Sequence, residues 1–291
     1  MNAASSIDER VQLAIKEIER TGAFTRKAIC ILIPTGTGWI NPEMADSFEY
    51  VENGDSAIIS VQYSYLPSWI SFLVDKSRAT EAGEKLIDGV YDKWSTLAET
   101  KRPKLYVAGL SLGSYGAQAA FSGSSDIRTR TNGALLVGTP NDTGLWRDIT
   151  GSRNQGSPER LPIYKDRETV RFTDSLGIDE VKPDDWDNPR ILYIQNASDP
   201  IVWWTPSLIF RKPDWLSEPR GADVLTSTGW YPFVSFSQIS FDQMIGTEVP
   251  DGHGHNYKTP VADGWVIVVK PDGWDDEKRE QLEQLMATYQ D

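Results

Sequence analysis

The chain has 291 residues, a net charge of −13, and 39% hydrophobic and 24% charged residues, which is an ordinary balance for a globular protein. This acidity argues against a protein that binds the backbone of nucleic acids, and no stretch approaches the roughly 18–20 apolar residues that cross a bilayer. The one cysteine, Cys30, allows no internal disulfide, and any histidine chemistry must use His253 or His255.

Both ends of the chain are predicted to form amphipathic helices packed on a sheet. Ser6 and Glu9 form a capping-box pattern, and the apolar residues behind them recur on one helical face until Gly22. The segment from Asp275 has the same character. Its apolar stripe consists of Leu282, Leu285, Met286 and Tyr289.

Short apolar runs between these ends predict the strands of a sheet. Runs without alternation suit strands that are buried on both faces, as in a parallel sheet. Helical stretches such as residues 81–97 separate them, and this alternation predicts an α/β fold with a mostly parallel central sheet flanked by helices. The predicted strands are residues 28–33, 57–61, 105–108, 134–137, 191–194 and 266–269.

The loop after the first predicted strand is rich in glycine, with the sequence Pro34-Thr35-Gly36-Thr37-Gly38-Trp39. Such a loop can turn sharply and expose backbone N–H groups to an anion. Thr37 is the candidate for one donor of an oxyanion hole, with Thr35 and Gly36 as the next choices. A phosphate cradle is the alternative, but no lysine follows and G-x-G-x-x-G is absent.

The predicted strand at 105–108 leads directly into the G-x-S-x-G motif Gly109-Leu110-Ser111-Leu112-Gly113, and a helix rich in small residues follows. In this strand-to-helix setting the motif holds a nucleophilic serine in a strained turn above the sheet. Ser111 is therefore the predicted nucleophile. The backbone N–H of Leu112 points where an oxyanion would form. The competing interpretation is a glycine-rich turn that only packs tightly.

A serine hydroxyl needs a base, and in this arrangement the acid and then the histidine follow the serine along the chain. Asp199 follows the strand at 191–194 and is the predicted acid, although Asp-Pro is also common turn chemistry. His255 is the predicted base and His253 the second choice. A zinc site at His-x-His is disfavoured because no third histidine or nearby cysteine is available.

Two long stretches, at about residues 141–189 and 200–252, do not fit simple crossovers. Long insertions in a compact domain usually serve as functional loops or lids. We therefore expect a single domain over residues 1–291 with two lid-like insertions. Trp203 and Trp204, in the second insertion, are candidates for the wall of an apolar substrate pocket, and core packing is the alternative.

Five stretches, at residues 20–24, 34–39, 62–69, 109–114 and 252–257, form one set of motifs. Taken together, these motifs resemble the catalytic domain of a bacterial α/β-hydrolase family whose members usually carry it after a multi-helix membrane region. The resemblance covers nearly the whole chain and implies an α/β-hydrolase fold, a serine nucleophile and no cofactor. The chain is expected to be soluble as given, with membrane contact only through a region that it lacks.

The expected function is hydrolysis of a carboxylic ester through an acyl-enzyme on Ser111, with a small-molecule or lipid-like ester as substrate and no metal. Peptidase and lipase activity stay open, because the motif does not encode the leaving group. The same residues would also serve an acyltransferase. A binding module that keeps the fold without catalysis is the alternative from another class.

Overall fold

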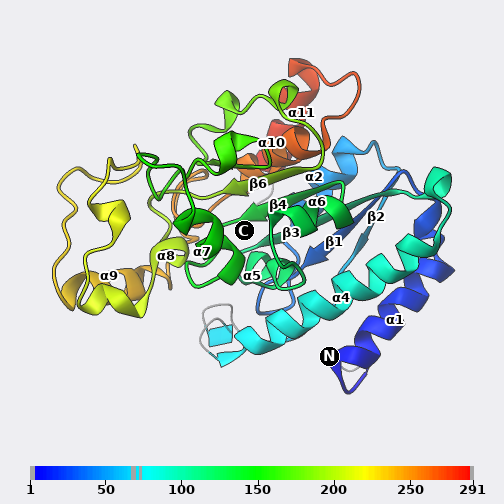
Figure 1. Ribbon diagram of the computed structural model, residues 1–291, viewed down its shortest axis with the longest axis horizontal. Helices are drawn as coiled ribbons and strands as arrows, with labels where there is room; N and C mark the ends of the chain where they lie inside the picture. Colours follow the sequence, from blue (N-terminus) through cyan, green and yellow to red (C-terminus); the bar gives the residue numbers. More distant parts are fainter. Residues whose placement is uncertain (1–3, 67–69, 72–73, 289–291) are drawn as a thin grey trace.

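The computed structural model describes residues 4–66, 70–71 and 74–288, which are arranged as shown in Figure 1. In this part of the chain six strands form one sheet in the order β2-β1-β3-β4-β6-β5, and every neighbouring pair is parallel. The strands are β1 (Ala28–Ile33), β2 (Ser56–Ile59), β3 (Lys104–Leu110), β4 (Gly133–Val137), β5 (Val170–Thr173) and β6 (Arg190–Ile194).

Helices and short 3₁₀ turns connect these strands. The α-helices are α1 (Ile7–Arg20), α2 (Pro42–Val51), α4 (Lys76–Thr96), α5 (Leu112–Gln118), α6 (Ser124–Arg130), α7 (Gly144–Gly151), α8 (Pro200–Trp203), α9 (Val234–Asp242), α10 (Lys258–Val269) and α11 (Asp276–Ala287). The 3₁₀ turns are η1 (Ala23–Thr25), η2 (Glu99–Lys101), η3 (Lys165–Arg167), η4 (Ile178–Glu180), η5 (Pro183–Asp185), η6 (Pro206–Ile209) and η7 (Asp214–Leu216).

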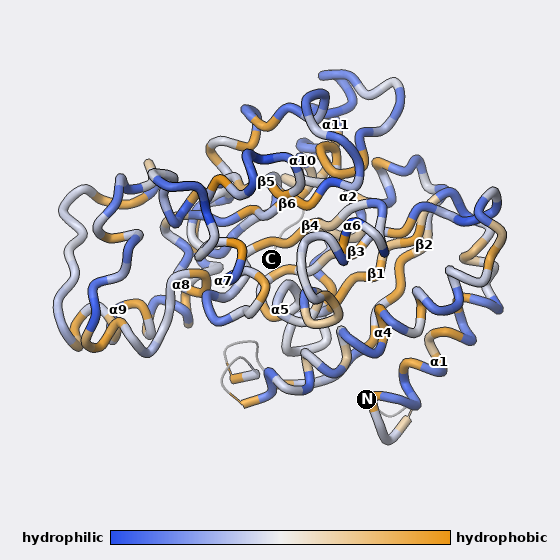
Figure 2. The backbone as a smooth tube through the Cα atoms, in the orientation of Figure 1, coloured by the Kyte–Doolittle hydropathy of each residue, from blue (hydrophilic) through white to orange (hydrophobic). Residues whose placement is uncertain are grey.

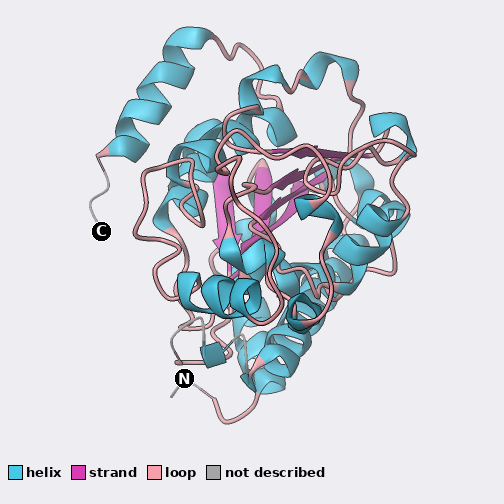
Figure 3. Ribbon diagram, turned by 90° about the vertical axis from the view of Figure 1, so that its left-hand side faces the viewer, coloured by secondary structure: helices cyan, strands magenta, loops and turns pink. Residues whose placement is uncertain are grey.

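The sheet is covered by helices on both faces, which is why its strands are almost continuously apolar. One core cluster joins alternate residues of β1, such as Ile29 and Ile31, to helices α1, α4, α5 and α7. The other joins the intervening residues, such as Cys30 and Leu32, to α2, α10 and α11. Figure 2 shows the hydrophobic character of the central strands, and Figure 3 shows the sheet enclosed by helices. The α/β fold expected from the sequence is confirmed.

Both predicted terminal helices are present and begin at the expected residues. The Ser6 hydroxyl accepts a hydrogen bond from the Glu9 N–H at 3.2 Å, and Asp275 caps α11 in the same way. However, α1 packs mainly against α4, and α11 packs against α10 and α2. They therefore form an outer layer rather than lying directly on the sheet. Of the predicted α11 stripe, Leu282 and Met286 are buried and Leu285 is exposed, while Tyr289 lies outside the described residues.

Five of the six predicted strands are confirmed, and the sixth is wrong. Residues 266–269 form the last turn of α10, which is buried on almost every side. A short apolar run cannot distinguish a buried strand from a buried helix, because neither shows a polar face. Strand β5 was not predicted; it lies inside the stretch 141–189 and carries the polar Arg171 and Thr173 at the edge of the sheet.

The parallel arrangement brings the carboxyl ends of all strands to one edge of the sheet. The Gly-rich loop at 34–39, the turn after β3 and the loops after β4 and β6 all start at this edge. Ligands of open α/β sheets bind in this position. The segment containing α8 and α9 extends away from the sheet on the left of Figure 1. Among the described residues, none of the helices combines the length and the apolar character needed to cross a bilayer.

Helices α4 and α5 approach each other through glycines, and this contact positions the helix that follows Ser111. A Cβ atom at Gly83 would lie 2.0 Å from the backbone oxygen of Gly116, far closer than packing allows. A Cβ atom at Gly89, on the same helix, would meet side chains only, with the flexible end of Ile15 at 2.6 Å and Cγ1 of Val11 at 3.4 Å. The close approach therefore depends on Gly83 and not on Gly89.

Gly83→Ala is expected to lower the free energy of unfolding by about 2 kcal/mol or more, because the backbone of α5 must move. Gly89→Ala is the matched control and should be neutral or slightly stabilising, since both changes raise helix propensity equally, by about 1 kcal/mol. Urea unfolding of the two variants measures the difference. Equal effects of the two substitutions would show that the α4–α5 contact is not closely packed.

Candidate active site

Ser111 occupies a strained turn between β3 and α5. Its φ of 57° and ψ of −124° lie in a region that residues with side chains rarely adopt. The Ser111 N–H donates to the Val137 carbonyl of β4 at 2.9 Å. A Cβ at Gly109 would lie 2.3 Å from the backbone of Gly113, and one at Gly113 would lie 2.3 Å from the Ile33 carbonyl. Both glycines of the motif are therefore required by close backbone contacts around Ser111.

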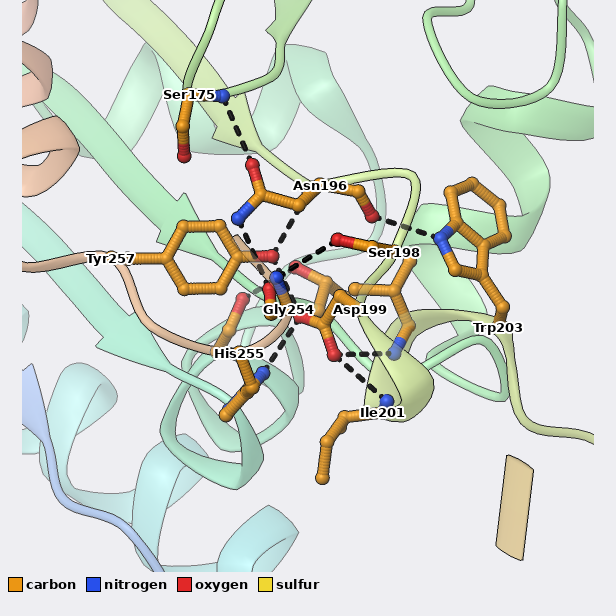
Figure 4. Close-up of polar contacts among 12 residues, drawn as sticks. Ser175, Asn196, Ser198, Asp199, Ile201, Trp203, Gly254, His255 and Tyr257 are labelled. Atoms are coloured by element: carbon orange, nitrogen blue, oxygen red, sulfur yellow. Dashed lines mark hydrogen bonds and ion pairs between the residues drawn. The ribbon is translucent and has the colours of Figure 1, made fainter. Parts of the chain in front are cut away.

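Asp199 follows β6, and its side chain is fully buried. One carboxylate oxygen, Oδ1, caps α8 by accepting from the N–H groups of Ile201 at 2.8 Å and Val202 at 3.4 Å. The other, Oδ2, lies 2.7 Å from Nδ1 of His255 and accepts from the Tyr257 hydroxyl at 2.6 Å. Figure 4 shows these contacts. The turn role and the proposed site role of Asp199 thus involve different oxygens of one carboxylate.

His255 is buried beside the end of β4. Its backbone N–H donates to the Gly246 carbonyl at 2.8 Å, and a Cβ at Gly138 would lie only 2.6 Å from Cε1 of its ring. Gly138 directly follows Val137, whose carbonyl binds the Ser111 amide. The imidazole and the serine turn are therefore both anchored at the end of β4. Among the described residues, none hydrogen-bonds the Ser111 hydroxyl, and such bonds often form only when substrate binds.

His253 lies in a different environment from His255. It is partly exposed, and its Nδ1 lies 3.2 Å from the backbone oxygen of Asp251. The structure therefore brings His255, and not His253, against Asp199.

Further hydrogen bonds tie the loop of Asp199 to the loop of His255. The Asn196 amide donates to the Gly254 carbonyl at 3.0 Å, and the Gly254 N–H donates to the Ser198 hydroxyl at 2.9 Å. The Ser198 hydroxyl in turn donates to Asp223, at 2.6 Å. Asn196, Ser198 and Tyr257 were not among the predicted site residues. For Asn196 and Ser198 the available signal was their placement directly after the buried strand β6, where polar side chains must find partners. This signal does not apply to Tyr257, which directly precedes α10.

The Tyr257 hydroxyl is held as a hydrogen-bond donor. Burial, together with the neighbouring charge of Asp199, raises the pKa of Tyr257 well above its ordinary value. The phenol therefore keeps its proton at neutral pH, and this proton is directed at Asp199.

The candidate oxyanion donors lie on two neighbouring elements. Leu112 is the first residue of α5, beside Ser111. In the loop after β1, the Thr35 N–H donates to the Trp39 carbonyl at 3.0 Å, and the Gln62 side chain holds the Thr37 carbonyl at 3.0 Å. Gly36 is buried within this turn and Thr37 is exposed at its tip. The turn thus has a fixed shape next to the start of α5.

A family model described as an alpha/beta-hydrolase family matches residues 1–282. The chain belongs to the alpha/beta-hydrolase family. This confirms the family resemblance inferred from the motifs and agrees with the parallel sheet and its flanking helices. No curated protein matches this hydrolase-family chain by sequence.

Solved structures show weak similarity to this alpha/beta-hydrolase. An acetylxylan esterase has a TM-score of 0.37 at 12% identity, over 61% of this chain and 85% of the esterase. A dienelactone hydrolase from Anabaena variabilis has a TM-score of 0.32 at 11% identity, over 63% and 80% of the two chains. Est1E from Butyrivibrio proteoclasticus has a TM-score of 0.27 at 15% identity, over 45% and 46%. Similarities this low say nothing about the substrate of this chain.

Trp203 and Trp204 have different surroundings in this hydrolase. Trp203 is 2% exposed, packs against Trp146 and Trp215 and donates from Nε1 to the Asn196 carbonyl at 2.9 Å. Trp204 is only partly buried and donates to the Ser240 hydroxyl at 2.8 Å. Trp203 therefore belongs mainly to the core beneath the Asp199 loop.

A cavity of about 370 Å³ lies between the Asp199 loop and the segment 215–242. Trp203, Trp215 and Ile239 contribute apolar walls, and Asp199 and Asp223 contribute polar ones. Its volume lies within the range of small-molecule pockets. Neither Ser111 nor His255 lines it.

The described residues contain no group of three or more His, Cys, Asp or Glu side chains that is arranged to hold a metal ion. Cys30 is fully buried in β1, where burial raises the pKa of its thiol. A thiol in such surroundings is inert.

Trp203→Phe is expected to lower the free energy of unfolding by about 2–3 kcal/mol, because it leaves a cavity and deprives the Asn196 carbonyl of its donor. Trp204→Phe, with a partly exposed ring, should cost about 1 kcal/mol or less. Denaturant unfolding of both variants measures the two values. A larger loss for Trp204→Phe would contradict the assignment of Trp203 to the core.

Proposed function

We propose that this chain is a serine hydrolase that cleaves a carboxylic ester through an acyl-enzyme on Ser111. Membership of the alpha/beta-hydrolase family supports the reaction class. The observation that carries the proposal is the buried hydrogen bond between Asp199 and His255. The His255 ring lies at the end of β4, the strand whose Val137 carbonyl accepts from the Ser111 N–H. A serine, a histidine and an acid at one edge of the sheet are what acyl transfer requires.

In the proposed first step, His255 removes the proton of the Ser111 hydroxyl as the oxygen attacks the ester carbonyl. Donation from Nδ1 to Asp199 leaves the lone pair of Nε2 free to accept that proton. The imidazolium that results is stabilised by the carboxylate 2.7 Å away. His255 then returns the proton to the departing alcohol, so that an acyl group remains on Ser111.

The negative charge on the carbonyl oxygen needs donors that are already in place. We assign this role to the backbone N–H groups of Leu112 and Thr37. The turn at residues 35–39 is held by its own hydrogen bonds and by Gln62, which would limit reorganisation during the reaction. Water, activated by His255, then hydrolyses the acyl-enzyme.

The same acyl-enzyme would pass its acyl group to an alcohol in an acyltransferase. Product analysis with an added acceptor alcohol separates transfer from hydrolysis. We propose a small or lipid-like ester as substrate, because the segment that borders the site exposes many large apolar side chains. They are Phe210, Leu225, Tyr231, Phe233, Val234, Phe241, Met244 and Ile245.

Ser111→Ala and His255→Ala are each expected to lower kcat for a p-nitrophenyl ester by about 10³-fold or more, because each removes part of one catalytic unit. His253→Ala is the matched control, since it deletes an imidazole two residues away that does not contact Asp199. Its kcat should stay within about threefold of the parent.

Steady-state kinetics with several acyl chain lengths provides the measurement, and thermal unfolding shows that each variant is folded. Full turnover by folded Ser111→Ala would refute the assignment of the nucleophile. A large loss in His253→Ala with activity kept in His255→Ala would instead make His253 the base.

A further inference from the structure

The Tyr257 hydroxyl lies between two groups of the Asp199 loop. It accepts a hydrogen bond from the Asn196 N–H at 3.0 Å and donates to Oδ2 of Asp199 at 2.6 Å. The tyrosine is 3% exposed, and its ring lies edge-on to His255 with 5.7 Å between the ring centroids. Figure 4 shows the phenol directed into this group of contacts.

Oδ2 of Asp199 therefore has two donors, the phenol and Nδ1 of His255. The other oxygen is occupied by the backbone N–H groups at the start of α8. An ionised carboxylate that is fully buried depends on such donors, because no water replaces a donor that is lost. The phenol is the only side-chain donor besides His255 that the described residues offer to this carboxylate.

The phenol also changes the strength of the neighbouring bond. Two donors on one oxygen share its negative charge. Each hydrogen bond to Oδ2 of Asp199 is therefore weaker than it would be if the other donor were absent. The hydrogen bond that the Tyr257 hydroxyl accepts from the Asn196 N–H polarises the phenol, and this strengthens the hydrogen bond that the phenol donates to Asp199. The Tyr257 hydroxyl thus affects the orientation of the Asp199 carboxylate and the strength of its hydrogen bond with His255.

We infer that Tyr257 is a positioning residue, which fixes the carboxylate of Asp199 and moderates its hydrogen bond to His255. The consequence for turnover rests on the proposed function, in which His255 is the base. Tyr257 itself transfers no proton in this scheme, since burial and the Asp199 charge raise its pKa and keep the phenol protonated. If the Tyr257 ring served only for packing, Tyr257→Phe would keep that role, because phenylalanine has the same aromatic ring.

The test compares Tyr257→Phe with Tyr193→Phe. Tyr193 is also fully buried, and its hydroxyl donates to the Gln118 side chain at 2.8 Å, so each variant removes one buried, hydrogen-bonded phenol hydroxyl. The readout is the ¹⁵N chemical shift of the imidazole nitrogens in long-range ¹H–¹⁵N spectra. The chain has only two histidines, and the loss of one set of signals in His255→Ala assigns both rings.

In Tyr257→Phe we expect the Nδ1 signal of His255 to move toward the position of a more strongly hydrogen-bonded nitrogen, because Oδ2 has lost its second donor. The signals of His253 should not move, and Tyr193→Phe should leave both rings unchanged. We also expect kcat for the ester to fall about tenfold in Tyr257→Phe with KM unchanged, as for the loss of one hydrogen bond to a charged group.

A His255 Nδ1 signal that stays in place in folded Tyr257→Phe, or that moves equally in Tyr193→Phe, would overturn the inference. The nitrogen shift does not depend on turnover. An inactive parent protein, or an active Ser111→Ala variant, would therefore refute the proposed function and leave this test of Tyr257 intact.

Discussion

The arrangement of this site depends on one buried carboxylate. Asp199 is removed from water, and within the described residues its side chain forms no ion pair with lysine or arginine. Burial of an unpaired anion costs several kcal/mol, so its lone pairs must be occupied. The structure meets this requirement with the N–H groups at the start of α8, the phenol of Tyr257 and the imidazole of His255. The same bonds that stabilise the charge therefore orient the ring, and structure and proposed catalysis share one network.

The parallel sheet explains why groups distant in sequence meet here. The turn at Ser111 follows β3, the imidazole of His255 lies over Gly138 after β4, and Asp199 follows β6. These three strands are neighbours in the sheet. The strained φ of Ser111 is maintained because Gly109 and Gly113 allow backbone contacts that any side chain would block.

Local chemistry made part of this structure predictable from the sequence. The continuous apolar runs located five strands, Ser6 and Asp275 marked the starts of helices, and G-x-S-x-G between a strand and a helix located the turn at Ser111. Residues 266–269 were misassigned because a helix buried on all sides lacks the polar face that reveals its period. The edge strand β5 was not predicted because its sequence contains polar residues and no continuous apolar run.

The contacts between loops could not be predicted from the sequence. Nothing local distinguishes His255 from His253, and only the three-dimensional approach of residue 255 to residue 199 separates them. Tyr257 was visible as part of a glycine- and histidine-rich motif, but its partner lies 58 positions away. Trp203 was predicted as a pocket wall by composition; its burial and its bond to Asn196 also make it part of the core, and it lines the cavity beside Asp199.

Covalent labelling by an alkyl fluorophosphonate, followed by intact-mass measurement and peptide mapping, tests the role of Ser111 most directly. The oxygen of an activated serine attacks the phosphorus of the reagent and displaces fluoride, so that one phosphonyl group stays bound to the serine. An ordinary serine does not react. The proposed role of Ser111 predicts one phosphonyl group per chain, located on Ser111, and no labelling of folded His255→Ala. A folded parent protein that stays unlabelled, or that is labelled on another residue, would contradict it.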